Sequence, residues 1–446
     1  MKPWSLRRKI ALAVLCAAIV VGLGVAWWML PPRALAFAGG PGVALADYKG
    51  PSPAGVPAEL RAADPATRGR YLAKAADCEV CHTAEGGAPF AGGRAIKTAF
   101  GTFYSPNITA DAETGIGAWS DAEFLRAVHQ GVGKHGERLY PAFPYESYTL
   151  MADDDVLAIK AYLFSLPKVH LQAPPHALVF PFNHRGLVGL WSLAYNPDQR
   201  FRPHPDRSPA WNRGAYLAEA LAHCGDCHTP RNLGQALDNR RKFSGAVTEG
   251  WRAFNITADR ASGVGDWSDA DLARYISGGH VAGRGAAAGP MAEAIDAGLG
   301  SLSPGDLSAL VAYLRSVPAI GDRRLPATRL QPASDLPKVM AASYDVRGRQ
   351  VFEQACASCH SWSGVSLLSP HATLTGVRAV NDVSATNVAA IVIAGQPGAT
   401  SGDLAMPAFG HAYSDVEIAA VANYVTARFG AKGSKLAAAD VAKLRP

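Results

Sequence analysis

Apolar positions recur at helical spacing in three well-separated parts of the chain, and each part opens at an acidic residue or beside a serine, as helices do. These segments are Asp153 to Leu166, Pro304 to Val317 and Ser414 to Phe429. A short Arg-Gly sequence stands upstream of each: Arg68-Gly69-Arg70-Tyr71-Leu72, Arg213-Gly214-Ala215-Tyr216-Leu217 and Arg347-Gly348-Arg349-Gln350-Val351. The pattern predicts three copies of one unit, each opening with a short helix and closing with an amphipathic one. A tyrosine common to the closing helices is expected to pack between the two helices of its unit: Tyr162, Tyr313 and Tyr424.

The N-terminal part of the chain has a different pattern, because the whole run from Ile10 to Leu30 carries no charge. The run is long enough to cross a bilayer as one helix. Basic residues precede it and Trp27-Trp28 close its far end, so the rest of the chain is expected outside the cytoplasm. The alternative is a cleaved signal peptide, since Ala34-Leu35-Ala36 fits an A-x-A site, but signal sequences usually have shorter apolar regions. The length of the apolar run favours an uncleaved anchor. Under either interpretation the body of the protein is exported.

Net charge narrows the possible partners. The chain of 446 residues carries a formal charge of +6, and four of its cationic residues precede the apolar run: Lys2, Arg7, Arg8 and Lys9. The remainder is therefore nearly neutral, which argues against nucleic acid as a partner.

Six of the seven cysteines lie in three Cys-x-x-Cys-His segments, one in each predicted unit. The segments are Cys78-Glu79-Val80-Cys81-His82, Cys224-Gly225-Asp226-Cys227-His228 and Cys356-Ala357-Ser358-Cys359-His360. Two thiols three residues apart share one face of a helical turn, where each can form a thioether with a haem vinyl group, and the adjoining histidine can bind the iron. A zinc site would need four ligands close together, and a thioredoxin-type dithiol would need alternating strands and helices, which the flanking sequence lacks. The motifs therefore predict three covalently bound haem c groups, with His82, His228 and His360 as proximal ligands.

The first two units share further sequence. Asn107 matches Asn255 in Asn-Ile-Thr segments, and Trp119 matches Trp267 in Gly-x-Gly-x-Trp-Ser segments. These side chains could hydrogen-bond haem propionates, or they could fix a long loop.

The connection between the first two units, residues 171 to 206, is apolar and aromatic and contains Phe180 and Trp191. Such a segment could dock on a partner or enter the membrane interface. Packing over a neighbouring unit is the more common behaviour of such a segment.

Methionine is scarce, which narrows the choice of sixth iron ligands. Each unit holds one methionine in a suitable place: Met151, Met291 and Met406. Met340 precedes the third unit and is expected to serve ordinary packing. Thioether ligation raises the potential of an electron-transfer haem. In the first unit, His129, His135 or an open position are alternatives to Met151.

Together these residues resemble the three-haem cytochrome c subunit of bacterial membrane-bound dehydrogenases. The resemblance covers about residues 60 to 430 and includes Leu139-Tyr140-Pro141-Ala142-Phe143-Pro144-Tyr145 and Gly289-Pro290-Met291-Ala292-Glu293. It implies an all-α fold of three tandem class I cytochrome c domains after an N-terminal transmembrane helix. The expected bounds are 10–30 for the helix and 62–168, 207–319 and 343–432 for the domains. Many relatives have methionine where this chain has Phe143, which leaves the coordination of the first haem open.

The resemblance also implies a role. We expect an inner-membrane protein whose haem domains face the periplasm and take electrons from a catalytic dehydrogenase subunit that uses flavin, pyrroloquinoline quinone (PQQ) or molybdenum. Ubiquinone or a terminal oxidase would accept the electrons. No residue of the chain is expected to act chemically on an organic substrate. The alternatives are a peroxidase-like haem enzyme with an open first haem, and a cytochrome subunit of a terminal oxidase.

Overall fold

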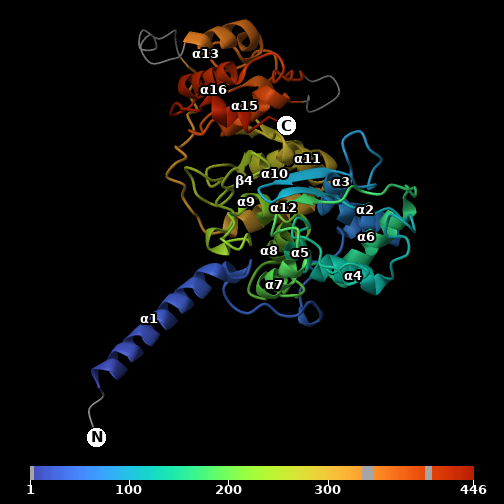
Figure 1. The fold of residues 1–446 in the computed structure, drawn as a ribbon. Helices are drawn as coiled ribbons and strands as arrows, with labels where there is room; N and C mark the ends of the chain where they lie inside the picture. The colour runs from blue at the N-terminus through green and yellow to red at the C-terminus, as the bar shows by residue number, and fades with distance from the viewer. Residues whose placement is uncertain (1–4, 334–345, 397–403, 446) are drawn as a thin grey trace.

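A computed structural model describes residues 5–333, 346–396 and 404–445, and Figure 1 shows three helix pairs that follow one another along the chain. The start of the third expected domain at 343, and Met340, lie outside the described residues. The pairs are α2 (Pro65–Ala75) with α6 (Asp153–Ser165), α8 (Pro209–Tyr216) with α12 (Pro304–Ser316), and α13 (Val346–Val351) with α16 (Asp415–Phe429). The predicted closing helices are thus confirmed to within one residue at each end.

Each helix pair crosses at a glycine. A methyl group at Gly69 would lie 1.8 Å from the Ala158 carbonyl oxygen, and at Gly214 it would lie 1.9 Å from the Ala309 carbonyl oxygen. At Gly348 the corresponding distance, to the Ala420 carbonyl oxygen, is 2.2 Å. Only glycine permits so close an approach of two helix backbones. The Arg-Gly repeat is therefore a packing requirement of the fold.

The predicted tyrosines lie at these crossings. Of the three closing helices, two have a side-chain cap at their start. Tyr313 and Tyr424 are buried and Tyr162 packs against the core, which confirms their packing role. Ser303 and Ser414 cap α12 and α16 through their side chains. In contrast, Ala152 at the start of α6 offers no side-chain cap, and three aspartates in the first turn interact with the helix dipole instead.

Short helices and loops surround these pairs. The motif helices are α3 (Cys78–His82), α9 (Gly225–His228) and α14 (Ala357–His360). The others are α4 (Asp121–Gln130), α5 (Tyr145–Tyr148), α7 (Gly186–Tyr195), α10 (Asp269–Gly278), α11 (Pro290–Ala297), α15 (Thr386–Ala394) and α17 (Ala438–Ala442).

Short antiparallel strands interrupt the helical layout. They are β1 (Ala95–Thr98), β2 (Gly101–Tyr104), β3 (Ala177–Leu178), β4 (Ala246–Thr248), β5 (Trp251–Ala253), β6 (His280–Val281) and β7 (Gly285–Ala286). Ala95 pairs with Tyr104, Ala246 with Ala253 and His280 with Ala286, and β3 adds to the edge of β2. An all-α description is therefore correct for the helix pairs but omits these ribbons, which are too short to give a periodic signal.

The first two units share one hydrophobic core, whereas the third has its own. Leu72 and Leu163 belong to the same buried cluster as Tyr216 and Leu310. The cluster of the third unit includes Phe352 and Tyr424, and it extends past residue 432 to the fully buried Val441 of α17. The first two units thus form a fused pair, and the third unit keeps a core of its own.

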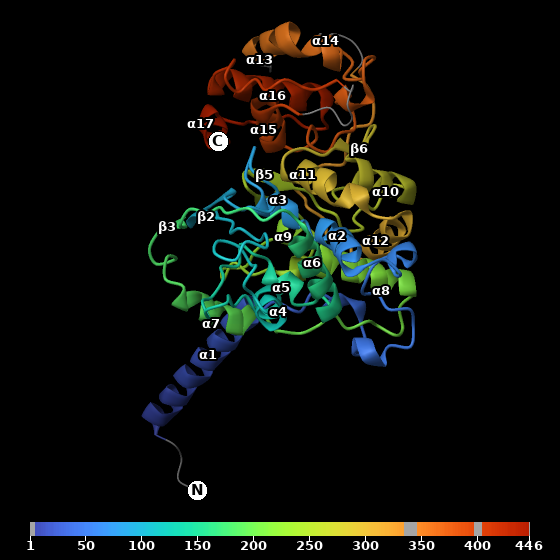
Figure 2. The same ribbon diagram turned by 90° about the vertical axis from the view of Figure 1, so that its right-hand side faces the viewer.

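Helix α1 (Leu6–Met29) projects from this body as a single rod, and α13 to α16 lie at the opposite end of the molecule in both views (Figures 1 and 2). Its window Leu6–Val25 is long and apolar enough to cross a membrane, and none of that window is buried against the protein. The helix begins earlier than the expected residue 10, because its basic first turn is also helical.

Candidate functional site

All three motif histidines are held in the same way. The Nδ1 of His82 lies 2.8 Å from the Pro106 carbonyl oxygen, that of His228 lies 2.7 Å from the Phe254 oxygen, and that of His360 lies 2.6 Å from the Ala372 oxygen. A carbonyl can only accept, so each Nδ1 carries the proton and donates it. Burial lowers the pKa of each imidazole, which keeps the rings neutral. Each Nε2 therefore keeps its lone pair for a metal, as a haem ligand requires.

The motif cysteines suit covalent attachment better than metal binding. Burial raises the pKa of Cys78, Cys81, Cys224 and Cys227 to about 12. A zinc site needs thiolates, which such environments disfavour. None of the cysteines forms a disulfide, and within the described ranges no three His, Cys, Asp or Glu side chains are grouped to hold a metal ion. Both observations fit haem thioethers.

The matched asparagines of the first two units fix their loops. Asn107 Nδ2 donates to the Val169 carbonyl at 2.7 Å, and Asn255 Nδ2 donates to the Ile320 carbonyl at 2.6 Å. Each side-chain oxygen accepts a backbone N–H two residues later. Because these amides are already hydrogen-bonded on both sides, the loop-fixing interpretation holds for them rather than propionate binding.

The first two units are joined by two equivalent tyrosine–aspartate hydrogen bonds, which we call the clasp. The Tyr71 hydroxyl donates to Asp306 at the start of α12 (2.6 Å), and the Tyr216 hydroxyl donates to Asp155 at the start of α6 (2.6 Å). Each tyrosine hydroxyl also accepts a backbone N–H from the opposite unit, from Ser303 and Ala152 respectively. The two units are thus related by an approximate two-fold exchange of contacts.

Sequence analysis missed this role of the tyrosines, although a signal existed. Both follow the crossing glycine by two residues in the first two units, whereas Gln350 occupies that position in the third. The change from tyrosine to glutamine marks the unit that has no equivalent partner.

We expect Tyr71→Phe and Tyr216→Phe each to lower the free energy of unfolding by about 1–3 kcal/mol, because each removes one hydrogen bond to a buried carboxylate. The carboxylates keep their other donors, which are Arg213 for Asp306 and the Gly55 backbone N–H for Asp155. Chemical denaturation followed by far-UV circular dichroism measures the change. Tyr162→Phe is the matched control, since its hydroxyl makes no hydrogen bond with any described residue. Equal losses in all three variants would contradict the clasp.

Each of the first two Cys-x-x-Cys-His motifs also contacts the other unit. Ser147 Oγ donates to Asp226 at 3.1 Å, and Arg231 pairs with Glu146 at 2.8 Å, so α5 lies on the second motif. In return α11 contacts α3, and Glu293 pairs with Arg94 at 2.7 Å. The motif helices α3 and α9, which would hold two of the haems, therefore both lie at the interface of the first two units.

Asp77 is a strained and electrostatically costly residue at this interface. It directly precedes Cys78, has a positive φ of 55°, and its buried Oδ1 has no hydrogen-bond partner in the described residues. Burial is the main reason that the pKa of Asp77 rises to about 6. Glu293 raises it further, whereas His223 and Arg94 lower it.

This shift predicts that stability falls as pH rises from about 4 to about 6. The pKa of Asp77 is higher in the folded state, about 6, than the ordinary 3.8 of an unfolded chain, so the folded state holds the proton more tightly and deprotonation favours unfolding. Over this pH range the contribution of Asp77 lowers the free energy of unfolding by roughly 3 kcal/mol. Denaturant unfolding of the wild type and of Asp77→Asn at pH 4 and pH 7 tests this, with the variant expected to be relatively more stable at pH 7. An identical pH response in both proteins would rule it out.

The three methionines lie in different settings. Met151 is almost completely buried in the shared core. Met291 is half-buried in the first turn of α11, after Gly289 with a φ of 55°. Met406 packs against the core of the third unit, and its backbone pairs with Gln396 in both directions.

Two further residues that bear on the first haem, the rival ligand His129 and the substituted position Phe143, also have defined places. His129 is buried beside the backbone of Met151, and its Nε2 has no hydrogen-bond partner among the described residues. Burial, opposed by Asp153 and by a hydrogen bond to Met151, lowers the pKa of His129 to about 4. The Phe143 ring lies 5.4 Å from the ring of Tyr148, whose hydroxyl donates to the Ala76 carbonyl just before the first motif.

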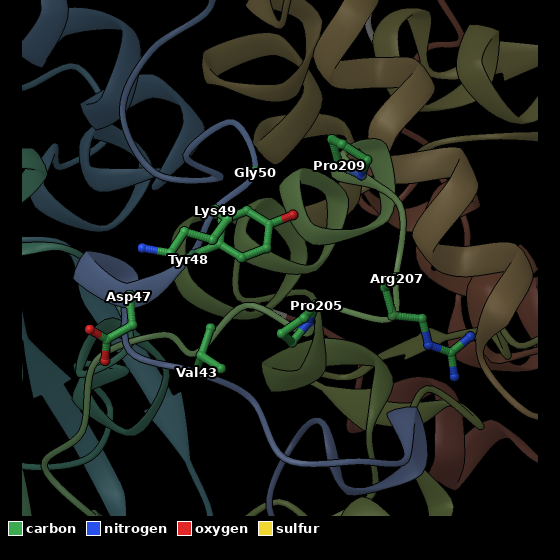
Figure 3. A pocket seen from close by; sticks show the side chains of 8 residues that line it. All are labelled: Val43, Asp47, Tyr48, Lys49, Gly50, Pro205, Arg207 and Pro209. Atoms are coloured by element: carbon green, nitrogen blue, oxygen red, sulfur yellow. The ribbon is translucent and has the colours of Figure 1, made fainter.

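A separate surface pocket of about 300 Å³ lies between the segment that follows α1 and the start of α8 (Figure 3). Its lining includes Tyr48, Lys49 and Arg207, but none of the motif cysteines or histidines. This pocket is therefore distinct from the candidate haem sites.

Comparison with known proteins identifies both ends of the body. Residues 66–167 match the family described as cytochrome c, and residues 345–425 match that described as cytochrome c oxidase, cbb3-type, subunit III. The fructose dehydrogenase cytochrome subunit of Gluconobacter japonicus is 36% identical over 400 residues, covering 85% of this chain and 82% of that protein.

Two further relatives are similar over most of this chain. The gluconate 2-dehydrogenase cytochrome c subunit of Pantoea cypripedii is 36% identical over 400 residues, covering 85% of this chain and 89% of its own length. One subunit of the nicotinate dehydrogenase of Pseudomonas putida is 39% identical over 367 residues, which are 82% of this chain but only 30% of that protein. Our chain thus matches nearly all of two relatives and a minor part of the third.

Proposed function

Because the chain belongs to the family of cytochrome c subunits of dehydrogenase complexes, we propose that it carries electrons away from a catalytic dehydrogenase subunit through three covalently bound haem c groups. Cytochrome c domains of this family bind haem c covalently, and electron transfer from a dehydrogenase follows from the family. The number of haems, the acceptor and the orientation in the membrane are our proposals.

The observation that carries this proposal is the threefold repetition of one histidine geometry. His82, His228 and His360 each donate from Nδ1 to a carbonyl outside the motif helix. The same contact in three places, each beside a cysteine pair, supports three equivalent haem sites.

The protein's part in the chemistry is to hold and tune the haems. When bound, a haem iron accepts and releases one electron at a potential set by its ligands and surroundings. The cysteines tether the macrocycle, and the histidine–carbonyl bond fixes ring orientation and strengthens the imidazole as a ligand. The packed interface between the first two units, at which α3 contacts α11 and α9 lies beside α5, fixes the separation of the first two sites, so no domain movement is needed for an electron to pass between them.

We propose Met291 and Met406 as sixth ligands of the second and third haems, and Met151 as that of the first. The half-buried positions of Met291 and Met406 support the former two. For the first haem, the unpartnered Nε2 of His129 makes that histidine the strongest rival. Comparing His129→Ala with Met151→Leu decides between them, because loss of the true ligand would give a high-spin first haem that binds carbon monoxide.

We further propose that α1 anchors the chain in the inner membrane, with the body in the periplasm and ubiquinone as acceptor. The uncharged length of α1 and the basic residues at its start support this orientation. The nature of the partner's own cofactor, flavin, PQQ or molybdenum, does not follow from this chain.

A terminal-oxidase subunit is the second candidate, favoured by the match of residues 345–425 to an oxidase subunit family. That match covers the third unit alone, whereas the dehydrogenase subunits match the body as a whole. We therefore rank the dehydrogenase role first.

Purification of the tagged full-length chain from its native membranes in mild detergent, with mass spectrometry of the co-purifying subunits, tests the proposal. We expect a dehydrogenase catalytic subunit in stoichiometric amount. Recovery with a copper-haem oxidase, or of the chain alone, would contradict the dehydrogenase role.

A further inference from the structure

Helix α7 exposes a continuous apolar face. Leu187, Leu190 and Leu193 are 48%, 68% and 81% exposed, and their spacing of three residues places them on one side of the helix. On the opposite side, Val188 and Ser192 are buried. The helix contains no charged residue at all. We call these three leucines the α7 ridge; an apolar surface of this kind on an otherwise soluble body marks an interaction site.

The α7 ridge is tied to the end of α1 by the loop that follows the second haem motif. Trp191 Nε1 donates to the Gly234 carbonyl at 2.6 Å, and Asn232 Nδ2 donates to the Met29 carbonyl at 2.7 Å. Leu233, between these two attachments, is 72% exposed and extends the apolar surface toward α1. Figures 1 and 2 show α7 beside the point where α1 leaves the body.

The segment leading into α7 has the composition of a membrane interface. Phe180 and Phe182 are 77% and 43% exposed. Arg185, at the start of α7, is exposed, and its guanidinium lies over the Tyr140 ring. Aromatic and basic side chains gather where a protein meets lipid headgroups.

We propose that the α7 ridge and Leu233 lie in the outer interface of the bilayer that α1 spans, as a second membrane contact. This inference rests on the proposed anchoring by α1. If α1 crosses the membrane, its end at Met29 lies at the outer headgroups, and the hydrogen bonds of Asn232 and Trp191 hold α7 at the same level. A helix there lies in the plane of the interface with its apolar side toward the acyl chains. The lipid surface is thus the occupant that the continuity with α1 selects.

Spin labelling of the full-length holoprotein in phosphatidylethanolamine–phosphatidylglycerol vesicles tests the contact. In a Cys16→Ser background, single labels are placed at Leu190→Cys and Leu193→Cys, with Leu15→Cys inside α1 as the anchor control. Leu367→Cys is the aqueous control, because Leu367 is 94% exposed in the third unit. The haem absorption spectrum checks that every variant is folded.

We expect labels at 190 and 193 to collide several-fold less often with a water-soluble nickel chelate, and more often with oxygen, than the label at 367. If both are as accessible to the chelate as 367 while the label at 15 is in lipid, the α7 contact is wrong and the anchor stands. Water-exposed labels at 190 and 193 would instead point to a protein subunit as the partner that covers the α7 ridge in the complex. If the label at 15 is itself in water, the anchor is wrong and the inference falls with it.

Discussion

Replacing Cys356 and Cys359 together by alanine should lower the haem content from the proposed three per chain to two and leave the first two haems unchanged. Without thioether bonds the third unit cannot keep its haem covalently. Its core is separate from that of the first two units, so the damage should stay local. Pyridine haemochrome assays and the mass of the intact protein measure the stoichiometry.

The matched change at Cys224 and Cys227 should have a larger effect, because the second motif lies in the core that the first two units share. Glu146 and Ser147 of the first unit bond to residues in or just after that motif, so misfolding there should also reduce haem attachment at Cys78 and Cys81. We expect clearly fewer than two haems per chain. Exactly one haem lost in both variants would show that the shared core does not couple attachment.

Met406→Ala should lower the midpoint potential of one haem by on the order of 0.1 V or more and make that haem reactive toward carbon monoxide. Loss of a thioether ligand removes the contribution that raises the potential and opens a coordination position. The backbone of Met406 remains paired with Gln396 through N–H···O bonds of 2.8 and 2.9 Å, so the loop should keep its place. Potentiometric titration and carbon monoxide difference spectra give the two readouts.

Phe409→Leu is the control for this experiment, since Phe409 packs against the same core without offering a ligand atom. It should leave both readouts unchanged. An unaltered potential in Met406→Ala would exclude Met406 as a ligand and direct attention to other side chains near the third haem.

The features predicted correctly were those with strong local periodicity or fixed spacing. The closing helices α6, α12 and α16 were placed to within a residue because their apolar stripes span several turns. The acceptors of the motif histidines were not predicted, although Pro106 and Phe254 occupy one position of the repeat, directly before the matched asparagines. The third acceptor, Ala372, lies only 12 residues after its histidine and has no counterpart in that repeat. The short strands carried too few residues for a pattern.

Long-range packing explains the remaining differences. The contact between the first two units includes the bonds of Tyr71 and Tyr216, whose partners lie 235 and 61 residues away in sequence. The apolar character of the connection at 171–206 was visible in the sequence. The sequence did not show that α7 would bury one side and expose the other. All but one of the helix's side chains, apart from its glycines, are apolar or aromatic, so its composition could not show which side faces the body.

The reciprocal tyrosine–aspartate clasp bears on how such a chain can change over evolutionary time. Either of the first two units, taken alone, would lose the tyrosine hydroxyl that its neighbour now donates to its buried carboxylate, so neither is readily lost, duplicated or exchanged by itself. The third unit, which has glutamine at the clasp position and a core of its own, can be acquired or replaced without repair of the others. The first two units are therefore expected to be inherited as a pair, with the third as a separable unit.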